Sequence, residues 1–193
     1  MYDYLLGKIT ELTPTYLVLE ISNIGYQLNI SVNTYSALKV ESNEKIFVHQ
    51  IIREDAHLLY GFKEKKEREV FRLLLSVSGI GANTARMILS SLTPDEVAIA
   101  ITKENIHLLQ SIKGIGAKTA QRMVLDLKDK MAKVHISDEI IYPEYNTTTE
   151  EALSALVMLG FQKSLVEKTL SHITRETKDL TLEEMIKKAL KVL

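Results

Sequence analysis

The sequence predicts an α+β protein of several domains, in which a small β-barrel precedes two helical segments. Three observations predict this fold class. Runs rich in β-branched and aromatic residues fill residues 1–62. Apolar residues at helical spacing dominate the remainder. Two closely similar glycine-containing octapeptides occur within the first helical segment. A chain of 193 residues has room for one to three small domains.

Residues 1–62 contain five runs of strand length that are separated by turn signals. Asn23-Ile24-Gly25 is a turn between the second and third runs, and Asn33 is placed to cap a short helix over Thr34–Leu38. Five short strands with one small helix predict a compact Greek-key barrel of the OB type. The expected strands are Tyr4–Glu11, Tyr16–Glu20, Tyr26–Ile30, Ile46–Arg53 and His57–Phe62.

The repeated octapeptides predict two copies of one turn within residues 63–133. SGIGANTA at 78–85 and KGIGAKTA at 113–120 differ, from their first glycine onward, only at Asn83 and Lys118. Glycine is favoured where the backbone turns with positive φ or approaches another group closely. The flanking segments have helical spacing, so each copy is predicted to be a helix–hairpin–helix motif. The expected helices are Val70–Val77, Ala82–Ser91, Ile106–Ile112 and Ala117–Lys130, with a further helix beginning at Thr93-Pro94.

A glycine turn that leads into a helix exposes backbone N–H groups at the positive end of a helix dipole, where anions bind. A triphosphate-binding loop needs glycine directly before Lys118 and again five residues earlier, but Ala117 and Ile112 occupy those positions. Lys118 and Arg122 are four residues apart and therefore share a helical face, which suits the phosphates of a nucleic-acid backbone. The alternative is a purely structural corner with a buried isoleucine, and repetition of the turn favours a shared function.

The distribution of charge agrees with a polyanion as partner of the two hairpins. The net charge of the whole chain is −1. Residues 63–133 carry thirteen Lys and Arg against eight Asp and Glu, whereas residues 1–62 and 134–193 each have a net charge of −3. Because summed charge steers association, the positive excess favours nucleic acid at the hairpins.

Residues 134–147 combine acids with one proline and no sustained period, which predicts a flexible linker. Residues 148–193 are predicted to form a three-helix module. Thr148 with Glu151 and Thr181 with Glu184 have capping-box spacing. A tethered module of this size is typical of a protein-binding domain. Its last helix carries an apolar stripe of Leu182, Met185, Ile186, Ala189, Leu190 and Leu193.

No catalytic set, metal site or cofactor is expected. The chain has no cysteine, which excludes disulfides and cysteine metal sites, and its five histidines have no ligand spacing. A membrane helix needs about 20 apolar residues, and no such stretch is present. The expected location is therefore the cytoplasm.

The order of these segments resembles the RuvA family, the junction-recognition subunits of a bacterial branch-migration machine. Gly25-Tyr26, REDAHLLYGF at 53–62 and the two hairpins carry the resemblance, which covers the whole chain. The resemblance implies a non-catalytic homotetramer that holds a four-way DNA junction open, and it leaves open whether two tetramers stack as an octamer. It also implies that residues 148–193 recruit the RuvB ATPase and that a RuvC resolvase shares the complex, in recombination and DNA repair.

Carried over residue by residue, the resemblance implies that the DNA backbone contacts both hairpins. In the first hairpin Asn83 stands where the family pattern has a basic residue, so a neutral hydrogen bond is expected there. Glu54 and Asp55, at the turn between the last two strands, are implied to be an acidic pin at the junction centre; the alternative is a solvated turn. The expected backbone-binding residues are Gly79, Ile80, Gly81, Asn83, Thr84, Arg86, Gly114, Ile115, Gly116, Lys118, Thr119 and Arg122.

Two other functions remain in competition at the level of sequence. DNA glycosylases with this hairpin use a lysine at the Lys118 position together with an aspartate about eighteen residues later, where this chain has Ile136; the nearest acid is Asp138. Such enzymes also need an aromatic-lined pocket, and residues 63–133 contain only Phe71. A general single-strand binder built on the barrel is disfavoured by the negative net charge of residues 1–62.

Overall fold

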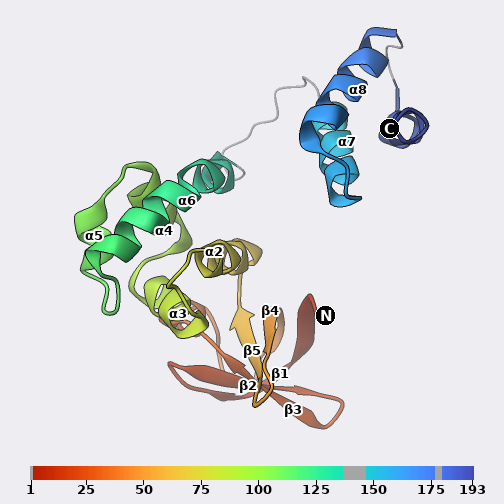
Figure 1. Ribbon diagram of the computed structural model, residues 1–193. Coiled ribbons are helices and arrows are strands. Elements are labelled where there is room, and N and C mark those ends of the chain that lie inside the picture. The colour runs from red at the N-terminus through yellow and green to blue at the C-terminus, as the bar shows by residue number, and fades with distance from the viewer. Residues whose placement is uncertain (1, 137–146, 177–179) are drawn as a thin grey trace. The chain divides into compact units, whose positions relative to one another are not determined.

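The computed structural model describes residues 2–136, 147–176 and 180–193 (Figure 1). The chain divides into two compact units, Met1–Glu139 and Ile140–Leu193, and each is described by itself. The first unit contains a barrel and the helices that carry the two hairpins. The second unit contains helices alone.

The first five strands form a closed barrel, which confirms the predicted OB-like fold. The strand order is β1-β2-β3-β5-β4, and the pairing is antiparallel everywhere except between β3 and β5. Leu17 and Leu19 point into the barrel on alternate positions of β2, as expected for a strand with one buried face. The strands are β1 (Tyr4–Leu12), β2 (Tyr16–Ile21), β3 (Ile24–Asn29), β4 (Asn43–Ile52) and β5 (His57–Phe62).

Two details of the barrel differ from the sequence prediction. The turn between β2 and β3 is formed by Ser22 and Asn23, both with positive φ, while Ile24 already belongs to β3. Helix α1 (Val32–Ser36) is capped by the Ser31 hydroxyl, which accepts a hydrogen bond from the Thr34 amide, so the prediction of Asn33 as the cap is wrong. Asn33 lies one position inside the helix, and its side chain is directed to another helix.

The helices of the first unit confirm the predicted double helix–hairpin–helix arrangement. Tyr60 and Phe62 of the barrel pack against Phe71, so the helices share one apolar core with one side of the barrel. The predicted Thr93 cap is confirmed as a complete capping box with Glu96. The helices are α2 (Lys65–Leu75), α3 (Ala82–Ser91), α4 (Pro94–Thr102), α5 (Ile106–Gln110) and α6 (Ala117–Ile136).

The second unit is a three-helix module, with α7 (Thr147–Met158), α8 (Lys163–Glu176) and α9 (Leu182–Leu190) around a small apolar core. The capping box of Thr181 and Glu184 is confirmed. Thr148, expected as a cap, lies inside α7. Residues 134–136 of the expected linker are the end of α6, and residues 137–146 lie outside the described part of the chain. Among the described residues, no helix is long and apolar enough to span a membrane.

Candidate nucleic-acid interface

The two glycine turns have the same backbone geometry. Gly79 and Gly114 both have a φ of +92°, a conformation that side chains disfavour. The Ile80 amide donates to the Val77 carbonyl at 3.1 Å, and the Ile115 amide donates to the Ile112 carbonyl at 3.0 Å. The sequence repeat is therefore a repeat of backbone structure, with one helix beginning directly after each turn.

The turns are open on the outside and filled on the inside. Ile80 and Ile115 are each 5% exposed, so their side chains occupy the core while the backbone of the turn remains at the surface. A Cβ atom placed on Gly81, Gly114 or Gly116 would meet no atom within 4 Å. The N-cap of α3 is Gly81 and makes no side-chain capping hydrogen bond, so no cap side chain occupies the N–H donors at the start of this helix.

The two hairpins lie side by side. A Cβ atom on Gly79 would stand 4.0 Å from the Thr119 hydroxyl oxygen, so the first turn touches the first helical turn of α6. The two open turns together therefore form one surface. The half-buried Thr84 and Thr119 occupy equivalent places at the starts of α3 and α6.

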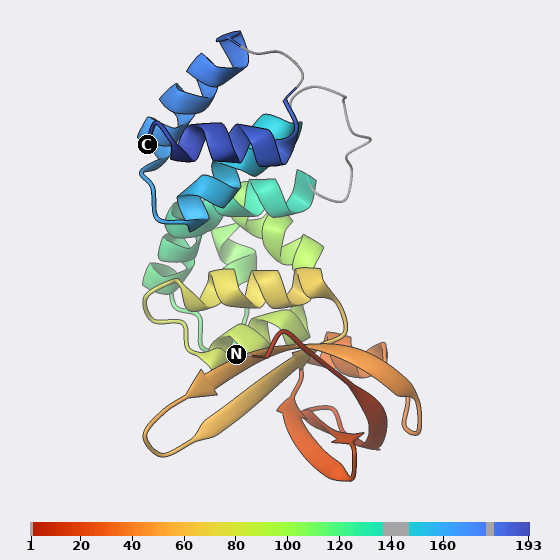
Figure 2. The ribbon, with the colours of Figure 1, turned by 90° about the vertical axis from the view of Figure 1, so that its right-hand side faces the viewer.

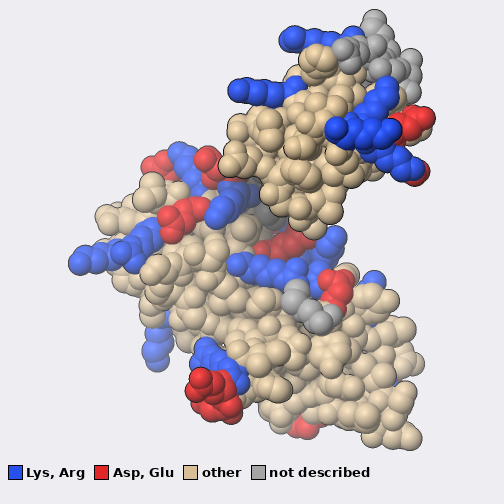
Figure 3. Space-filling view, turned by 45° about the vertical axis from the view of Figure 1, so that its right-hand side comes forward, with Lys and Arg blue, Asp and Glu red and all other residues tan. Residues whose placement is uncertain are grey.

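The basic side chains at this surface come from the second hairpin. Lys118 and Arg122 are exposed on α6. On the first hairpin the equivalent of Lys118 is the exposed Asn83, whose amide oxygen lies 3.5 Å from the Tyr60 hydroxyl. On the face shown in Figure 3, most Lys and Arg side chains lie over helices, whereas the barrel surface is largely neutral.

Arg86, expected among the DNA contacts, is directed toward the barrel. Its Nη1 atom donates to the Thr15 carbonyl at 2.9 Å and to the Asn29 amide oxygen at 3.3 Å. These bonds fix α3 against the loop between β1 and β2 and against the end of β3, so Arg86 has a structural contact in addition to any contact with DNA.

Glu54 and Asp55 form the loop between β4 and β5. The Arg53 amide donates to the Ala56 carbonyl at 2.8 Å and closes the loop, which leaves both carboxylates exposed. Figure 2 shows this loop at the free end of the β4–β5 hairpin, away from the helices. The acidic pair is therefore presented on a protruding tip.

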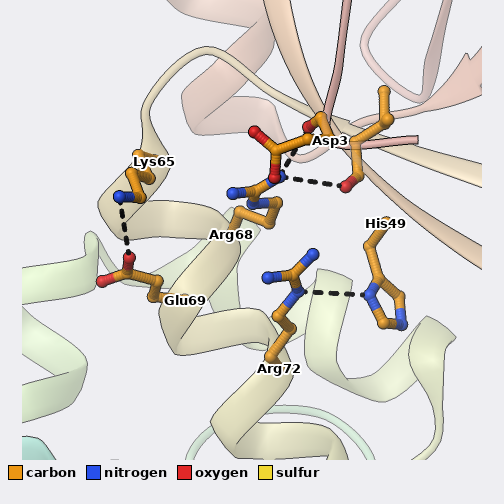
Figure 4. A network of polar contacts seen from close by, with 7 residues as sticks. Asp3, His49, Lys65, Arg68, Glu69 and Arg72 are labelled. Atoms are coloured by element: carbon orange, nitrogen blue, oxygen red, sulfur yellow. Dashed lines mark hydrogen bonds and ion pairs between the residues drawn. The ribbon is translucent and has the colours of Figure 1, made fainter. Parts of the chain in front are cut away.

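Two buried charged residues on α2 were not predicted from the sequence. Glu67 is 4% exposed and Arg68 is 2% exposed. Arg68 donates from Nη1 to the Asp3 carboxylate at 2.6 Å, and Arg72 donates from Nε to His49 Nδ1 at 3.4 Å (Figure 4). The spacing of the sequence could have indicated that Glu67 is buried, because Glu67 continues the helical stripe of Val70, Leu74 and Val77.

These polar contacts shift several pKa values. The Arg68 guanidinium lowers the pKa of Asp3, chiefly through its hydrogen bond. Burial lowers the pKa of His49, and the charges of Arg72 and Arg68 lower it further, which favours the neutral imidazole that accepts the hydrogen bond from Arg72. Burial raises the pKa of Glu67, against the effect of two hydroxyl donors.

The geometry does not favour the alternative functions. Phe71 is fully buried between barrel aromatics, and thus lines no base-binding pocket. Ile136 is the last residue of α6, and Asp138 lies outside the described residues. Within the described ranges, no group of three or more His, Cys, Asp or Glu side chains is placed to hold a metal ion.

A closed barrel followed by paired glycine turns on adjacent helices defines a tandem helix–hairpin–helix protein. Comparison with known families agrees. Residues 1–61 match the RuvA N-terminal domain, residues 71–129 match a SAM-like helix-hairpin-helix tandem, and residues 147–193 match the RuvA C-terminal domain. The chain belongs to the RuvA family.

Full-length relatives support this assignment. A protein of Parabacteroides distasonis is 51% identical over 197 residues, and one of Christiangramia forsetii is 50% identical over 193 residues, each match covering all of both chains. A protein of Flavobacterium psychrophilum is 47% identical over 191 residues, covering 99% of both. All three are named Holliday junction branch migration complex subunit RuvA.

Proposed function

We propose that this chain is a non-catalytic subunit that binds four-way (Holliday) DNA junctions, holds them open and recruits the RuvB ATPase for branch migration. Its relatives carry the name of a branch-migration complex subunit along their whole length. The observation that carries the proposal is the pair of open glycine turns, side by side and next to exposed basic residues, in the same compact unit as a protruding acidic loop.

The hairpins bind phosphate groups of the DNA backbone. The first N–H groups of α3 and α6 donate to phosphate oxygens, because a helix N-terminus presents unpaired donors and positive potential. Glycine at positions 79, 81, 114 and 116 keeps side-chain atoms out of the way. Lys118 and Arg122 neutralise phosphates and release counterions. Contacts of this type carry no sequence information, as junction recognition at varying sequences requires.

The acidic loop supplies the selection of junctions over continuous duplex. Carboxylates at Glu54 and Asp55 repel phosphates that approach within a Debye length of ~8–10 Å. Continuous duplex brings phosphates across the centre, whereas an open junction has strands that separate there. The loop therefore weakens the binding of continuous duplex more than the binding of a four-way junction.

The assembly is part of the proposal. Four copies around a four-fold axis place one hairpin pair on each junction arm and four acidic loops at the centre. Exposed apolar residues on β1, namely Tyr4 and Leu6 at 49% and 62% exposure, support a contact between copies. A single tetramer leaves one junction face open to a RuvC resolvase, whereas two stacked tetramers cover both. The mass of the saturated junction complex in solution separates these two states.

The C-terminal module, expected at residues 148–193, binds the motor through its apolar surface. Met158 and Leu159, at the corner between α7 and α8, are 85% and 62% exposed, whereas Leu156 is buried in the module core. Replacing Met158 and Leu159 with serine in the full chain removes stimulation of RuvB ATPase activity and leaves junction binding unchanged. Stimulation that persists in this variant excludes the corner as the motor contact.

The acidic loop gives the experiment that tests the proposed function. Glu54→Gln with Asp55→Asn keeps size and hydrogen bonding but removes two charges per chain. Affinities for a four-way junction and for linear duplex are measured at two salt concentrations. The unchanged chain binds the junction more tightly than the duplex, and the neutral variant gains duplex affinity, so its selectivity shrinks. Equal affinity of the unchanged chain for both DNAs refutes junction recognition, and unchanged selectivity in the variant makes the loop an ordinary solvated turn.

A further inference from the structure

Helix α1 joins the barrel to α2 through a buried carboxylate. The Ser31 hydroxyl donates to Glu67 Oε1, and the Thr34 hydroxyl donates to Glu67 Oε2 at 2.6 Å. Each hydroxyl also accepts a backbone hydrogen bond, Ser31 from the Thr34 amide at 3.0 Å and Thr34 from the Lys63 amide at 3.2 Å. Since each hydroxyl has a single hydrogen, both donors are committed to Glu67.

The same short helix also holds the end of α3. Asn33 donates from its amide nitrogen to the Leu89 carbonyl at 2.6 Å and to the Leu92 carbonyl at 3.0 Å. The Val32 amide donates to the Ser90 hydroxyl at 3.1 Å. The last carbonyls of a helix have no partner within that helix, so a side chain of the barrel caps α3 from outside.

These bonds attach both helices of the first hairpin to the barrel. Helix α2 precedes the first glycine turn and α3 follows it, and α1 is bonded to each. Arg68 on the adjacent position of α2 bonds to Asp3 and reaches a different part of the barrel (Figure 4). The helices of both hairpins share one apolar core, to which the second hairpin contributes Ile115, Met123 and Leu127. None of the described hydrogen bonds joins the second hairpin's helices to the barrel; Lys128 of α6 pairs with Glu104, which lies between α4 and α5.

The hydrogen bonds between α1 and helices α2 and α3 restrict relative movement more than apolar packing does. Apolar burial is non-directional and tolerates small sliding of one surface over another. Hydrogen bonds lose strength steeply with angle and with distance beyond about 3.2 Å. The barrel carries the acidic loop and α2 with α3 carries the first hairpin, so the bonds of α1 fix the position of one relative to the other.

We propose that Ser31, Asn33 and Thr34 of the α1 segment, together with Glu67, are positioning residues that set the spacing between the acidic loop and the first hairpin and thereby the selectivity for four-way junctions. This inference rests on the proposed function. A junction must meet the hairpins on its arms and the acidic loops at its centre simultaneously. A duplex bound to the hairpins alone has no such requirement, so loss of the fixed spacing weakens junction binding selectively.

A pair of substitutions at Thr34 separates the hydroxyl from the shape of the side chain. Thr34→Val keeps the branched shape and removes the hydroxyl, which donates to Glu67 and accepts from the Lys63 amide. Thr34→Ser keeps the hydroxyl and removes one methyl group. In the full chain, Thr34→Val lowers the ratio of junction to duplex affinity by roughly five- to a hundredfold, the effect of removing two hydrogen bonds. Duplex affinity stays unchanged, and Thr34→Ser restores the ratio. A merely structural role instead lowers both affinities together through the folded fraction.

A second variant and a distance measurement cover the case in which Thr34→Val does not fold. Asn33→Ala acts at the half-buried end of α3 and removes the outside cap of that helix. The chain contains no cysteine, so spin labels at His57→Cys and Ser78→Cys report the distance from loop to hairpin, with labelled chains diluted among unlabelled ones. The distance distribution broadens in Asn33→Ala, and junction selectivity falls with it.

The outcomes separate this inference from the proposed function. Selectivity and distance distribution that match the unchanged chain, in folded Thr34→Val and Asn33→Ala, overturn the positioning role while junction recognition stands. An unchanged chain that does not distinguish junction from duplex overturns the proposed function itself, whatever the spin labels report.

Discussion

The two hairpins share a backbone but differ in charge and in attachment. Both glycine turns have a φ of +92° and both bury an isoleucine. The first carries Asn83, and its helices are hydrogen-bonded to the barrel. The second carries Lys118 and Arg122 on a helix held mainly by apolar packing. The same turn thus occurs in two settings. We infer that the first hairpin is the one held at a fixed position relative to the barrel, and that the second supplies the positive charge for phosphate binding.

The largest expected effect follows from removing the charges of the second hairpin. Lys118→Ala and Arg122→Ala each weaken junction binding by roughly ten- to a hundredfold, the equivalent of one charge-assisted hydrogen bond. The slope of log affinity against log salt becomes shallower by about 0.9 for each phosphate that is no longer neutralised. Binding titrations at four salt concentrations, on junctions with unrelated arm sequences, measure both quantities.

Lys39→Ala is the matched control, because Lys39 is an exposed lysine of the barrel. It should leave affinity and slope unchanged. A change of sequence preference in Lys118→Ala, with the salt slope intact, contradicts phosphate binding by Lys118.

An intermediate effect is expected from the turns themselves. Gly79→Ala and Gly114→Ala place a side chain at positive φ and each reduce stability by about 1–3 kcal/mol. Gly81→Ala is the control, because Gly81 has a φ of −90° and open space around its Cβ position. Thermal unfolding of the full chain measures all three. If the two turns are equivalent, Gly79→Ala and Gly114→Ala lower the free energy of unfolding by the same amount. A large difference between the two losses contradicts this equivalence.

The smallest effect concerns the carboxylate that holds the first hairpin. Burial raises the pKa of Glu67, so the folded chain binds this proton more tightly than the unfolded chain. The contribution to stability is therefore full below the ordinary pKa of 4.5 and is lost as the pH rises through the folded-state pKa. Glu67→Gln cannot ionise, so the stability of the unchanged chain relative to this variant should fall as the pH rises above 4.5.

Glu67 lines a surface cavity that other charged groups also face. Lys63, Glu64 and Asp95 line it together with Glu67, and the charge of Glu64 raises the pKa of Glu67 further. Melting temperatures of both chains between pH 4.5 and pH 8 give the relative stability. If the unchanged chain becomes more stable than the variant as the pH rises, the sign is wrong and a raised pKa is contradicted.

Local signals predicted the elements of both hairpins. The identical GIGA segments predicted identical turns, and the cap at Thr93 lies where it was predicted. In the C-terminal module the same kind of local signal is right for the capping box at Thr181 and wrong for Thr148, which lies inside α7. The five strands are correct to within three residues at each end, because alternation and turn residues are properties of neighbouring positions. Helix α2 begins five residues earlier than expected, since its first turn is charged and gives no apolar period.

The attachment of the first hairpin was not predictable in the same way. Asn33 is a residue type that often caps its own helix, yet its side chain caps α3, which is distant in sequence. Glu67 and Arg68 are charged residues of the kind usually found on a solvated surface. Both are buried here, because their hydrogen-bond partners come from the barrel. Arg86 was expected on DNA and bonds to Thr15 and Asn29. Long-range hydrogen bonds leave no pattern in a single sequence.

Phosphate binding by the two hairpins is tested most directly by exchanging the single residue that distinguishes their turns. Lys118→Asn gives the second hairpin the GIGANTA sequence of the first, and Asn83→Lys gives the first the GIGAKTA sequence of the second. The salt dependence of junction affinity is measured for both variants and for the unchanged chain. We predict that the slope is shallowest in Lys118→Asn, intermediate in the unchanged chain and steepest in Asn83→Lys, in steps of about 0.9 per neutralised phosphate. Equal slopes in all three chains would contradict phosphate binding by the hairpins.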